Sequence, residues 1–146
     1  MVKKKILVTG ANGLLGQKII YNLKNRTDVS LLACSKGVNR LIETNGYKYI
    51  ELDITNKNQV QKVISTEKPD AVINCAAMTN VDKCEKYQKE CWEINVNAVE
   101  NIANSCELVK AHLLHLSTDF VFDGTAGPYN ETDQPNPLHF YAESKL

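Results

Sequence analysis

The chain has 146 residues, enough for one domain with a buried core, and its 17 basic and 17 acidic residues leave no net charge. This balance gives no reason to expect a nucleic acid or a membrane surface as partner, and no apolar run approaches the ~20 residues that span a bilayer. The five cysteines form neither a C-x-x-C motif nor a metal-like group with the three histidines, so no metal is expected. This cysteine usage, together with an N-terminus that lacks the apolar stretch of a signal peptide, predicts a cytoplasmic protein.

The first feature along the chain is a glycine-rich turn between a predicted strand at 4–8 and a predicted helix at 14–25. Three glycines lie there at G-x-x-G-x-x-G spacing. We expect Gly10 to make the tight turn, Gly13 to admit a pyrophosphate to the backbone N–H groups, and Gly16 to let the helix pack on the sheet. The pattern favours a dinucleotide-binding turn, and the alternative is a glycine-rich turn without a ligand.

Strand and helix patterns alternate along the rest of the chain. Strands are expected at 29–33, 47–51, 70–74 and 112–117, and helices at 57–67 and 84–108, with a short helical piece at 38–45. Such alternation predicts an α/β protein in which helices cover both faces of a parallel sheet. Right-handed crossovers then give a doubly wound Rossmann fold with strand order 3-2-1-4-5. Ligands of such sheets bind at the carboxyl ends of the strands.

The type of cofactor depends on the residues that follow the second predicted strand. An acid there would bind the ribose 2′-hydroxyl of NAD, whereas cations accommodate the 2′-phosphate of NADP. This segment contains Ser35, Lys36 and Arg40, with no acid before Glu43. These three residues are expected to bind the phosphate, which favours NADP(H) over NAD(H). The alternative is that Lys36 and Arg40 are solvated charges of a loop that binds no phosphate.

Residues 118–137 form the longest irregular stretch, and a loop of this length in a compact domain is usually functional. Asn136 and Pro137 then predict the start of a helix, with Asn as N-cap and Pro at the first helical position. That helix would stop at Leu146, about two turns later. The chain is therefore interpreted as a domain that is incomplete at its C-terminal end.

A tyrosine and a lysine lie four residues apart in this last segment. Tyr141 and Lys145 would project from one helix face, where the ammonium would lower the pKa of the phenol and make it a proton donor or acceptor near neutral pH. Thr118, at the end of the fifth predicted strand, can hydrogen-bond the same reacting oxygen. Taken alone, Y-x-x-x-K is more often a surface pair on an amphipathic helix.

As a set, these motifs resemble the extended short-chain dehydrogenase/reductases. The set comprises T-G-x-x-G-x-x-G, Asn74-Cys75-Ala76-Ala77, Ser117-Thr118-Asp119 and Y-x-x-x-K. Within that superfamily, segments 69–83, 116–124, 129–133 and 135–138 are similar to the dTDP-4-dehydrorhamnose reductases. The resemblance runs from Lys5 to the last residue. It implies that residues 1–146 are the NAD(P)-binding Rossmann domain, without the C-terminal substrate domain of that family.

The resemblance implies a role for each matching residue. Tyr141 would protonate the substrate carbonyl oxygen as hydride arrives from the nicotinamide, Lys145 would bind the nicotinamide ribose, and Thr118 would hydrogen-bond the substrate oxygen. The other cofactor contacts would be Gly10, Asn12, Gly13, Leu14, Leu15 and Gly16 at the pyrophosphate, Asp53 at the adenine with Ile54 beside it, and Ala76 and Ala77 along the cofactor. Thr79, Val81 and Asp119 would approach the sugar.

Three further positions bear on the resemblance. Asn95 resembles an asparagine that supports the active site in this family, with a polar residue on a solvated turn as the alternative. Phe120 stands where family members often have Tyr. Lys18 stands where some relatives carry an acid linked to a metal at the dimer interface, which again predicts no metal. The oligomeric state is left undecided, with a homodimer as one alternative.

The leading function that the resemblance implies is NADPH-dependent reduction of a 4-keto nucleotide sugar in dTDP-L-rhamnose biosynthesis, with the isolated chain inactive. A second interpretation is a non-catalytic regulatory subunit, because the methionine adenosyltransferase β-subunit shares the fold and the D-x-V-F-D-G loop. A third is a nucleotide-sugar epimerase or dehydratase. Dehydratases place an acid just after the Ser/Thr, which makes the role of Asp119 ambiguous.

Overall fold

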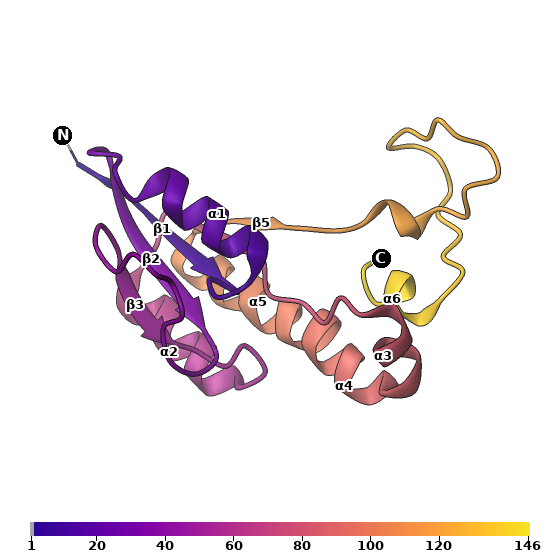
Figure 1. Cartoon of the computed structure of the whole chain (residues 1–146), viewed down its shortest axis with the longest axis horizontal. Helices are drawn as coiled ribbons and strands as arrows, with labels where there is room; N and C mark the ends of the chain where they lie inside the picture. The colour runs from indigo at the N-terminus through magenta and orange to yellow at the C-terminus, as the bar shows by residue number, and fades with distance from the viewer. Residues whose placement is uncertain (1) are drawn as a thin grey trace.

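The computed structural model describes residues 2–146 and contains a five-stranded parallel sheet of order β3-β2-β1-β4-β5 (Figure 1). The strands are β1 (Lys4–Thr9), β2 (Val29–Ser35), β3 (Lys48–Glu51), β4 (Ala71–Asn74) and β5 (His112–His115). Central β1 pairs with β2 and β4, so that Leu7 lies beside both Leu32 and Val72. The predicted doubly wound fold and its strand order are confirmed.

The helices are α1 (Leu14–Leu23), α2 (Lys57–Glu67), α3 (Val81–Lys86), α4 (Gln88–Trp92), the π-helical turn η1 (Glu93–Asn97), α5 (Ala98–Val109), the 3₁₀ turn η2 (Asp119–Val121) and α6 (Phe140–Glu143). The single helix predicted for 84–108 is therefore wrong, since Tyr87 leaves the helical conformation and η1 interrupts the α-helical hydrogen bonding. None of the helices between residues 2 and 146 has the length and apolar composition needed to cross a membrane.

The helical piece predicted at 38–45 is wrong, because that segment is a loop. Its backbone N–H groups bond to side chains instead of to carbonyls four residues earlier. The Arg40 N–H donates to Asn12 Oδ1 at 2.9 Å, and the Ile42 N–H donates to the Tyr21 hydroxyl at 3.1 Å. Tertiary contacts thus override the local helical pattern.

The helix start predicted at Asn136 and Pro137 is also wrong. The Asn136 side chain donates to Asp123 Oδ2 at 2.9 Å and does not cap a helix. The final helix begins at Phe140 instead, where His139 Nδ1 accepts a hydrogen bond from the Ala142 N–H at 3.1 Å.

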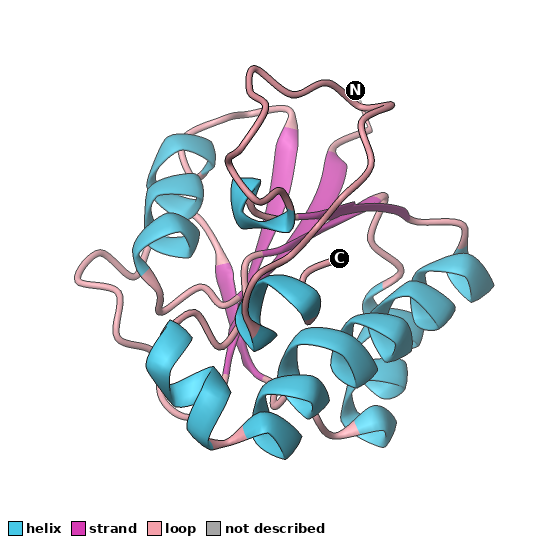
Figure 2. Ribbon diagram, turned by 90° about the vertical axis from the view of Figure 1, so that its right-hand side faces the viewer, coloured by secondary structure: helices cyan, strands magenta, loops and turns pink. Residues whose placement is uncertain are grey.

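Helices cover both faces of the sheet (Figure 2). Neighbouring residues of β1 point to opposite faces, so the strand contributes apolar side chains to the core on each face. Leu7 packs with Ile64 of α2 and Ile102 of α5. Val8 packs with Ile20 of α1 on the other face. These five side chains are at most 1% exposed. Burial of each stabilises the fold by about 1.5–3 kcal/mol.

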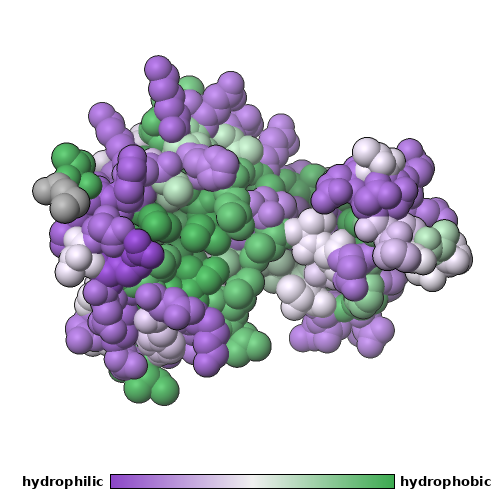
Figure 3. Space-filling model, turned by 90° about the horizontal axis from the view of Figure 1, so that it is seen from above, coloured by the Kyte–Doolittle hydropathy of each residue, from purple (hydrophilic) through white to green (hydrophobic). Residues whose placement is uncertain are grey.

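Apolar side chains remain exposed on the face that carries α1, which packs on β1 and β2. Leu14 is 80% exposed, and Leu15 and Leu114 are about half exposed. Figure 3 looks onto this side, where apolar atoms gather in the middle of the surface. Leu14 and Leu15 of this surface also line the second cavity described below.

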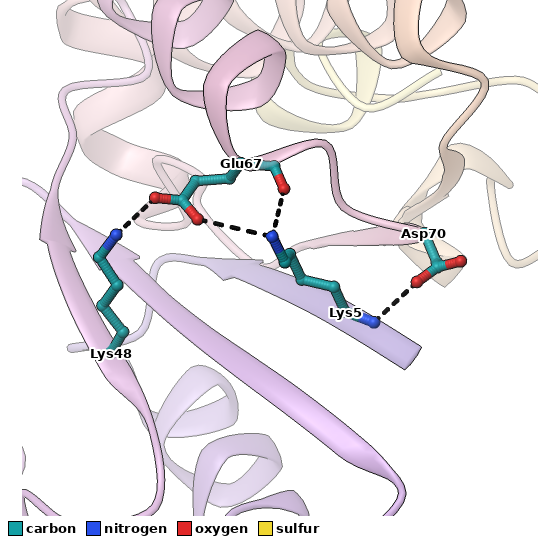
Figure 4. Close-up of polar contacts among 4 residues, drawn as sticks. All are labelled: Lys5, Lys48, Glu67 and Asp70. Carbon is teal, nitrogen blue, oxygen red and sulfur yellow. Dashed lines mark hydrogen bonds and ion pairs between the residues drawn. The ribbon is translucent and has the colours of Figure 1, made fainter. Parts of the chain in front are cut away.

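Polar contacts close the opposite, amino-terminal edge of the sheet (Figure 4). Glu67, the last residue of α2, accepts a hydrogen bond from Lys48 Nζ at 2.6 Å, and its carbonyl oxygen accepts from Lys5 Nζ at 2.6 Å. Asp70 accepts from the Lys5 backbone N–H at 2.8 Å, which lowers the pKa of its carboxyl group. These contacts join α2 to β1 and β3. They lie at the amino-terminal edge only, so the carboxyl ends of the strands remain accessible to a ligand.

Candidate functional site

The glycine turn follows β1 and leads directly into α1. Gly10 has φ +65°, and a Cβ atom there would lie 2.7 Å from the backbone nitrogen of Ala76. A Cβ on Gly16 would overlap the Gly10 carbonyl oxygen. Gly10 therefore makes the tight turn, and Gly16 lets the start of α1 lie against the backbone of that turn, at Gly10 and Ala11. Gly13 is the N-cap of α1 and forms part of both cavities described next.

Two cavities adjoin at Gly13, Cys75 and Ala77, where the carboxyl ends of the strands meet the helix start. The first, about 310 Å³, is also lined by Gly10, Asn12, Ser35, Lys36, Arg40, Asp53, Ile54 and Ala76. The second, about 640 Å³, is also lined by Leu14, Leu15, Gly16, Lys18, Thr79, Leu116, Ser117, Tyr141 and Lys145. Every residue predicted to contact the cofactor therefore lines one of two adjoining cavities.

An ion pair crosses the first cavity. Lys36 Nζ lies 2.7 Å from Asp53 Oδ2, and this contact raises the pKa of Lys36 and lowers that of Asp53. The other oxygen of Asp53 accepts hydrogen bonds from the Thr55 N–H and hydroxyl at 3.0 and 2.7 Å. Lys36, which was expected at the 2′-phosphate, and Asp53, which was expected at the adenine, thus form an ion pair with each other.

Asn12 shapes the loop that carries the two predicted cations. Its side chain accepts from the Arg40 N–H at 2.9 Å and donates to the Val38 carbonyl at 3.0 Å. Tyr49 supports the same loop by donating its hydroxyl hydrogen to the Gly37 carbonyl at 2.7 Å. Asn12 therefore positions Arg40 at the cavity, and Tyr49 is a supporting residue that sequence reasoning missed.

Tyr141 and Lys145 both line the second cavity, but they do not act on each other as predicted. Burial raises the pKa of the Tyr141 phenol, and hydrogen bonding from the side chain of Thr118 opposes this shift in part. Lys145 is 7% exposed, and its Nζ lies 3.1 Å from His115 Nε2. The predicted lowering of the Tyr141 pKa by Lys145 is therefore wrong, because the lysine faces the histidine.

The π-helical turn η1 places Asn95 between two parts of the site. Asn95 is 3% exposed, which excludes a solvated position. Its Oδ1 accepts from the Met78 N–H at 2.8 Å, while Nδ2 donates to the Met78 carbonyl at 3.0 Å and to Ser144 Oγ at 2.9 Å. π-helical insertions often occur at functional sites. Here the insertion links the loop after β4 to the end of α6.

The remaining predicted residues lie around this centre. Thr79 lies at the rim of the second cavity, and Val81 is the first residue of α3. Thr118 is the N-cap of η2, with its hydroxyl 3.2 Å from Asp119 Oδ1. Asp119 lines a third cavity of about 660 Å³, together with Phe120, Phe122, Tyr129 and His139.

The loop at 118–137 is ordered by Asp123. Its carboxylate accepts hydrogen bonds from the Thr125 N–H, the Tyr129 hydroxyl and Asn136 Nδ2 at 2.8–2.9 Å, which strongly lowers its pKa. The Tyr129 ring stacks on Phe122 with centroids 4.4 Å apart. The third cavity therefore has a stacked aromatic wall formed by Phe122 and Tyr129.

The parallel sheet, the glycine turn at α1 and the Tyr141–Lys145 pair at the carboxyl ends together define an extended short-chain dehydrogenase/reductase fold. The chain belongs to the RmlD substrate binding domain family, which matches residues 4–146.

Named relatives match nearly the whole chain. It is 37% identical over 142 residues to dTDP-4-dehydrorhamnose reductase of Aggregatibacter actinomycetemcomitans, covering 97% of this chain and 44% of that protein. It is 36% identical over 143 residues to methionine adenosyltransferase 2 subunit beta of Danio rerio, covering 98% and 42%. The chain therefore spans less than half the length of these relatives.

Among solved structures, the chain is similar to dTDP-4-dehydrorhamnose reductase from Bacillus anthracis in complex with NADP. The TM-score is 0.83 at 34% identity, covering 99% of this chain and 47% of that one.

Proposed function

We propose that this chain is the cofactor-binding part of an NADPH-dependent reductase of a 4-keto nucleotide sugar. The observation that carries the proposal is the pair of adjoining cavities, which brings the glycine turn, the Lys36 loop, Tyr141 and Lys145 to one edge of the sheet. The similarity to dTDP-4-dehydrorhamnose reductases, one of them in complex with NADP, supports this substrate class.

The residues present fit a dinucleotide. The space that a Cβ atom would fill at Gly10 and Gly16 is already occupied by neighbouring backbone, so that the turn closes tightly and the N-terminus of α1 is left for a pyrophosphate. The first cavity would hold the adenosine part, with Lys36 and Arg40 near the 2′-phosphate and Asp53 near the adenine. The nicotinamide, when bound, supplies the hydride.

On the substrate side, Tyr141 would donate its phenolic proton to the oxygen of the carbonyl group that accepts the hydride. A tyrosine phenol is protonated at neutral pH, as a proton donor requires. Burial raises the pKa of Tyr141 in this structure, whereas efficient proton transfer favours a pKa nearer to neutral. Thr118 would hold the same oxygen, and Lys145 would bind the nicotinamide ribose. Thr79, Val81 and Asp119 would contact the sugar.

A regulatory subunit is the second candidate, since a methionine adenosyltransferase β-subunit is about as similar to this chain as the reductase is. Such a protein would bind the dinucleotide in the same cavities and need not transfer hydride. The presence of Thr118, Tyr141 and Lys145 does not separate the two candidates. Segment 79–82 resembles the reductases more, which favours the reductase, and turnover of a 4-ketosugar discriminates between them.

Nucleotide titration tests the binding part of the proposal. We expect NADPH to bind the chain and to bind more tightly than NADH, as followed by nucleotide fluorescence. Catalysis is assayed with a dTDP-4-keto-6-deoxysugar and NADPH, where product analysis separates reduction from epimerisation or dehydration. Failure to bind either nucleotide would contradict the proposal. The isolated chain is expected to bind without turnover, so only binding without turnover in a longer protein that carries this chain would favour the regulatory subunit.

A further inference from the structure

Helix α6, which carries Tyr141, is a single turn that two side chains hold at its start. His139 is the N-cap, with extended backbone angles of φ −151° and ψ 159°. Its Nδ1 accepts a hydrogen bond from the Ala142 N–H at 3.1 Å, and the Glu85 carboxylate of α3 accepts from the Phe140 N–H at 2.6 Å. A helix of one turn has few hydrogen bonds of its own, so these two caps largely determine where it lies.

The imidazole of His139 also contacts the Tyr141 side chain. The two rings are stacked, with centroids 6.0 Å apart and planes inclined by 16°. Phe120 of η2 meets the imidazole edge-on, with centroids 5.3 Å apart. Helix α6 itself lies beside α3 (Figure 1). One side chain, that of His139, therefore fixes both the backbone of α6 and the ring of its tyrosine.

The hydrogen bond from Ala142 determines the protonation state of this ring. A backbone N–H only donates, so His139 Nδ1 must present a lone pair. A neutral imidazole then carries its proton on Nε2. In the cation both ring nitrogens carry hydrogens, and no rotation of the ring restores an acceptor for Ala142. The cap therefore requires a neutral His139.

The cap depends on pH for this reason, since imidazoles gain a proton as the pH falls from about 8 to 5. Other titratable side chains line the third cavity with His139 or belong to residues that bond or stack with its helix turn: Asp119, Asp123, Tyr129, Tyr141, Glu85 and Glu143. The carboxylates among them attract an imidazolium and do not oppose its formation. Lys145, which follows α6, faces His115.

We propose that His139 is a positioning residue for Tyr141, and that only its neutral form holds the tyrosine at the second cavity. When the imidazole becomes a cation, its Nδ1–H and the Ala142 N–H are two donors that face each other, and the cap is lost. The tyrosine then leaves the place where it would meet a carbonyl oxygen. The effect on turnover rests on the proposed function, whereas the cap and its loss with pH do not.

NMR of the ¹⁵N-labelled chain tests the cap directly. At about pH 8 we expect an imidazole protonated at Nε2 and a scalar coupling between the Ala142 amide nitrogen and His139 Nδ1 across the hydrogen bond. The coupling should disappear as His139 becomes a cation, and the Tyr141 ring signals should shift with the same midpoint. A neutral ring protonated at Nδ1, or a His139 titration that leaves the Ala142 and Tyr141 signals unchanged, would overturn the proposal.

Two substitutions separate the cap from its titration. His139→Asn places an amide oxygen near the position of Nδ1 and so keeps an acceptor that does not change charge. His139→Ala removes the acceptor at every pH. We expect the Tyr141 signals to lose this pH dependence in His139→Asn, and the Ala142 N–H to exchange about fivefold faster in His139→Ala. His112→Asn, on exposed β5, is the matched control and should change neither.

Turnover of a 4-keto nucleotide sugar with NADPH is compared in a longer protein that carries this chain. We expect kcat to fall as His139 becomes a cation, to lose this fall in His139→Asn, and to be about fivefold lower in His139→Ala at about pH 8. If His139→Ala does not fold, the coupling in the unsubstituted chain still decides the proposal. Parallel pH profiles of kcat for the unsubstituted protein and His139→Asn would overturn the positioning role and leave the proposed function intact. Absence of turnover at every pH, with the cap and its titration seen by NMR, would overturn the proposed function alone.

Discussion

Lys36 Nζ lies 2.7 Å from Asp53 Oδ2, so the residue predicted to bind a 2′-phosphate is paired with the residue predicted to contact adenine. The Lys36 side chain is 79% exposed, and ion pairs of this kind contribute at most about 1 kcal/mol. A phosphate dianion could therefore replace the carboxylate at little cost. The ion pair holds Lys36 at the first cavity, and it does not prevent a phosphate from replacing Asp53 as the partner of Lys36.

From this pair we predict that Lys36→Ala weakens NADPH binding more than NADH binding. The expected loss for NADPH is about 10-fold or more, since a hydrogen bond to a charged group contributes about 1.5–3 kcal/mol. NADH, which has no 2′-phosphate, should lose less than about threefold. The measurement is a fluorescence titration of both nucleotides, with Lys62→Ala on the exposed surface of α2 as the control. Equal losses for the two nucleotides would argue against a phosphate site at Lys36.

The glycine turn gives a prediction that separates stability from binding. Gly16→Ala should lower the free energy of unfolding by about 1–3 kcal/mol, because its Cβ overlaps the Gly10 carbonyl oxygen and overpacking of this kind carries that cost. Gly13→Ala should cost less stability, since its Cβ lies 3.2 Å from the same oxygen and its φ is an ordinary −81°. The methyl group at Gly13 would nevertheless stand where a pyrophosphate must approach. Urea unfolding and NADPH titration measure the two effects, and tight NADPH binding by folded Gly13→Ala would contradict the assignment.

The glycine turn and the strand order could be predicted because their signals are local or follow from handedness. The spacing of Gly10, Gly13 and Gly16 between a strand and a helix is readable in nine residues, and alternating elements with right-handed crossovers leave few strand orders. The loop at 38–45 could not be predicted, since its amide groups bond to Asn12 and other residues distant in sequence.

The contact between Lys145 and His115 was missed for the same reason. His115 and Asn74 are the last residues of neighbouring strands, and two polar residues at matching strand ends are a signal that the sequence does contain. The contact of His115 with Lys145 depends on how the chain after β5 returns to the sheet. Nothing local in the sequence describes that path, and so the lysine was assigned to Tyr141.

Asn95 gives a prediction about the stability of the contacts that join the loop after β4 to the end of α6. Asn95→Ala should lower the free energy of unfolding by about 1–3 kcal/mol, because it leaves the partly buried Met78 N–H without its partner. The Met78 carbonyl would lose Asn95 Nδ2 and keep only Cys84 Sγ, at 3.5 Å, as donor. It should also loosen the end of α6, which Ser144 fastens to Asn95. Asn104→Ala on the exposed surface of α5 is the control and should change stability by less than about 0.5 kcal/mol. Thermal unfolding measures both, and equal stabilities would mean that Met78 finds other partners.

Tyr141 gives a prediction about the proton donor of the proposed reductase. Tyr141→Phe removes the phenolic oxygen and keeps the ring that stacks near His139. We expect turnover to fall by about 10²–10⁴-fold, the usual contribution of a positioned proton donor. NADPH affinity should stay within about threefold, because the phenol acts on the oxygen that develops charge during hydride transfer, and the loss therefore falls on kcat. Because the isolated chain is expected to be inactive, turnover is measured in a longer protein that carries this chain, with Tyr87→Phe on the exposed surface next to α4 as the control. Near-normal turnover by Tyr141→Phe would show that another group supplies the proton.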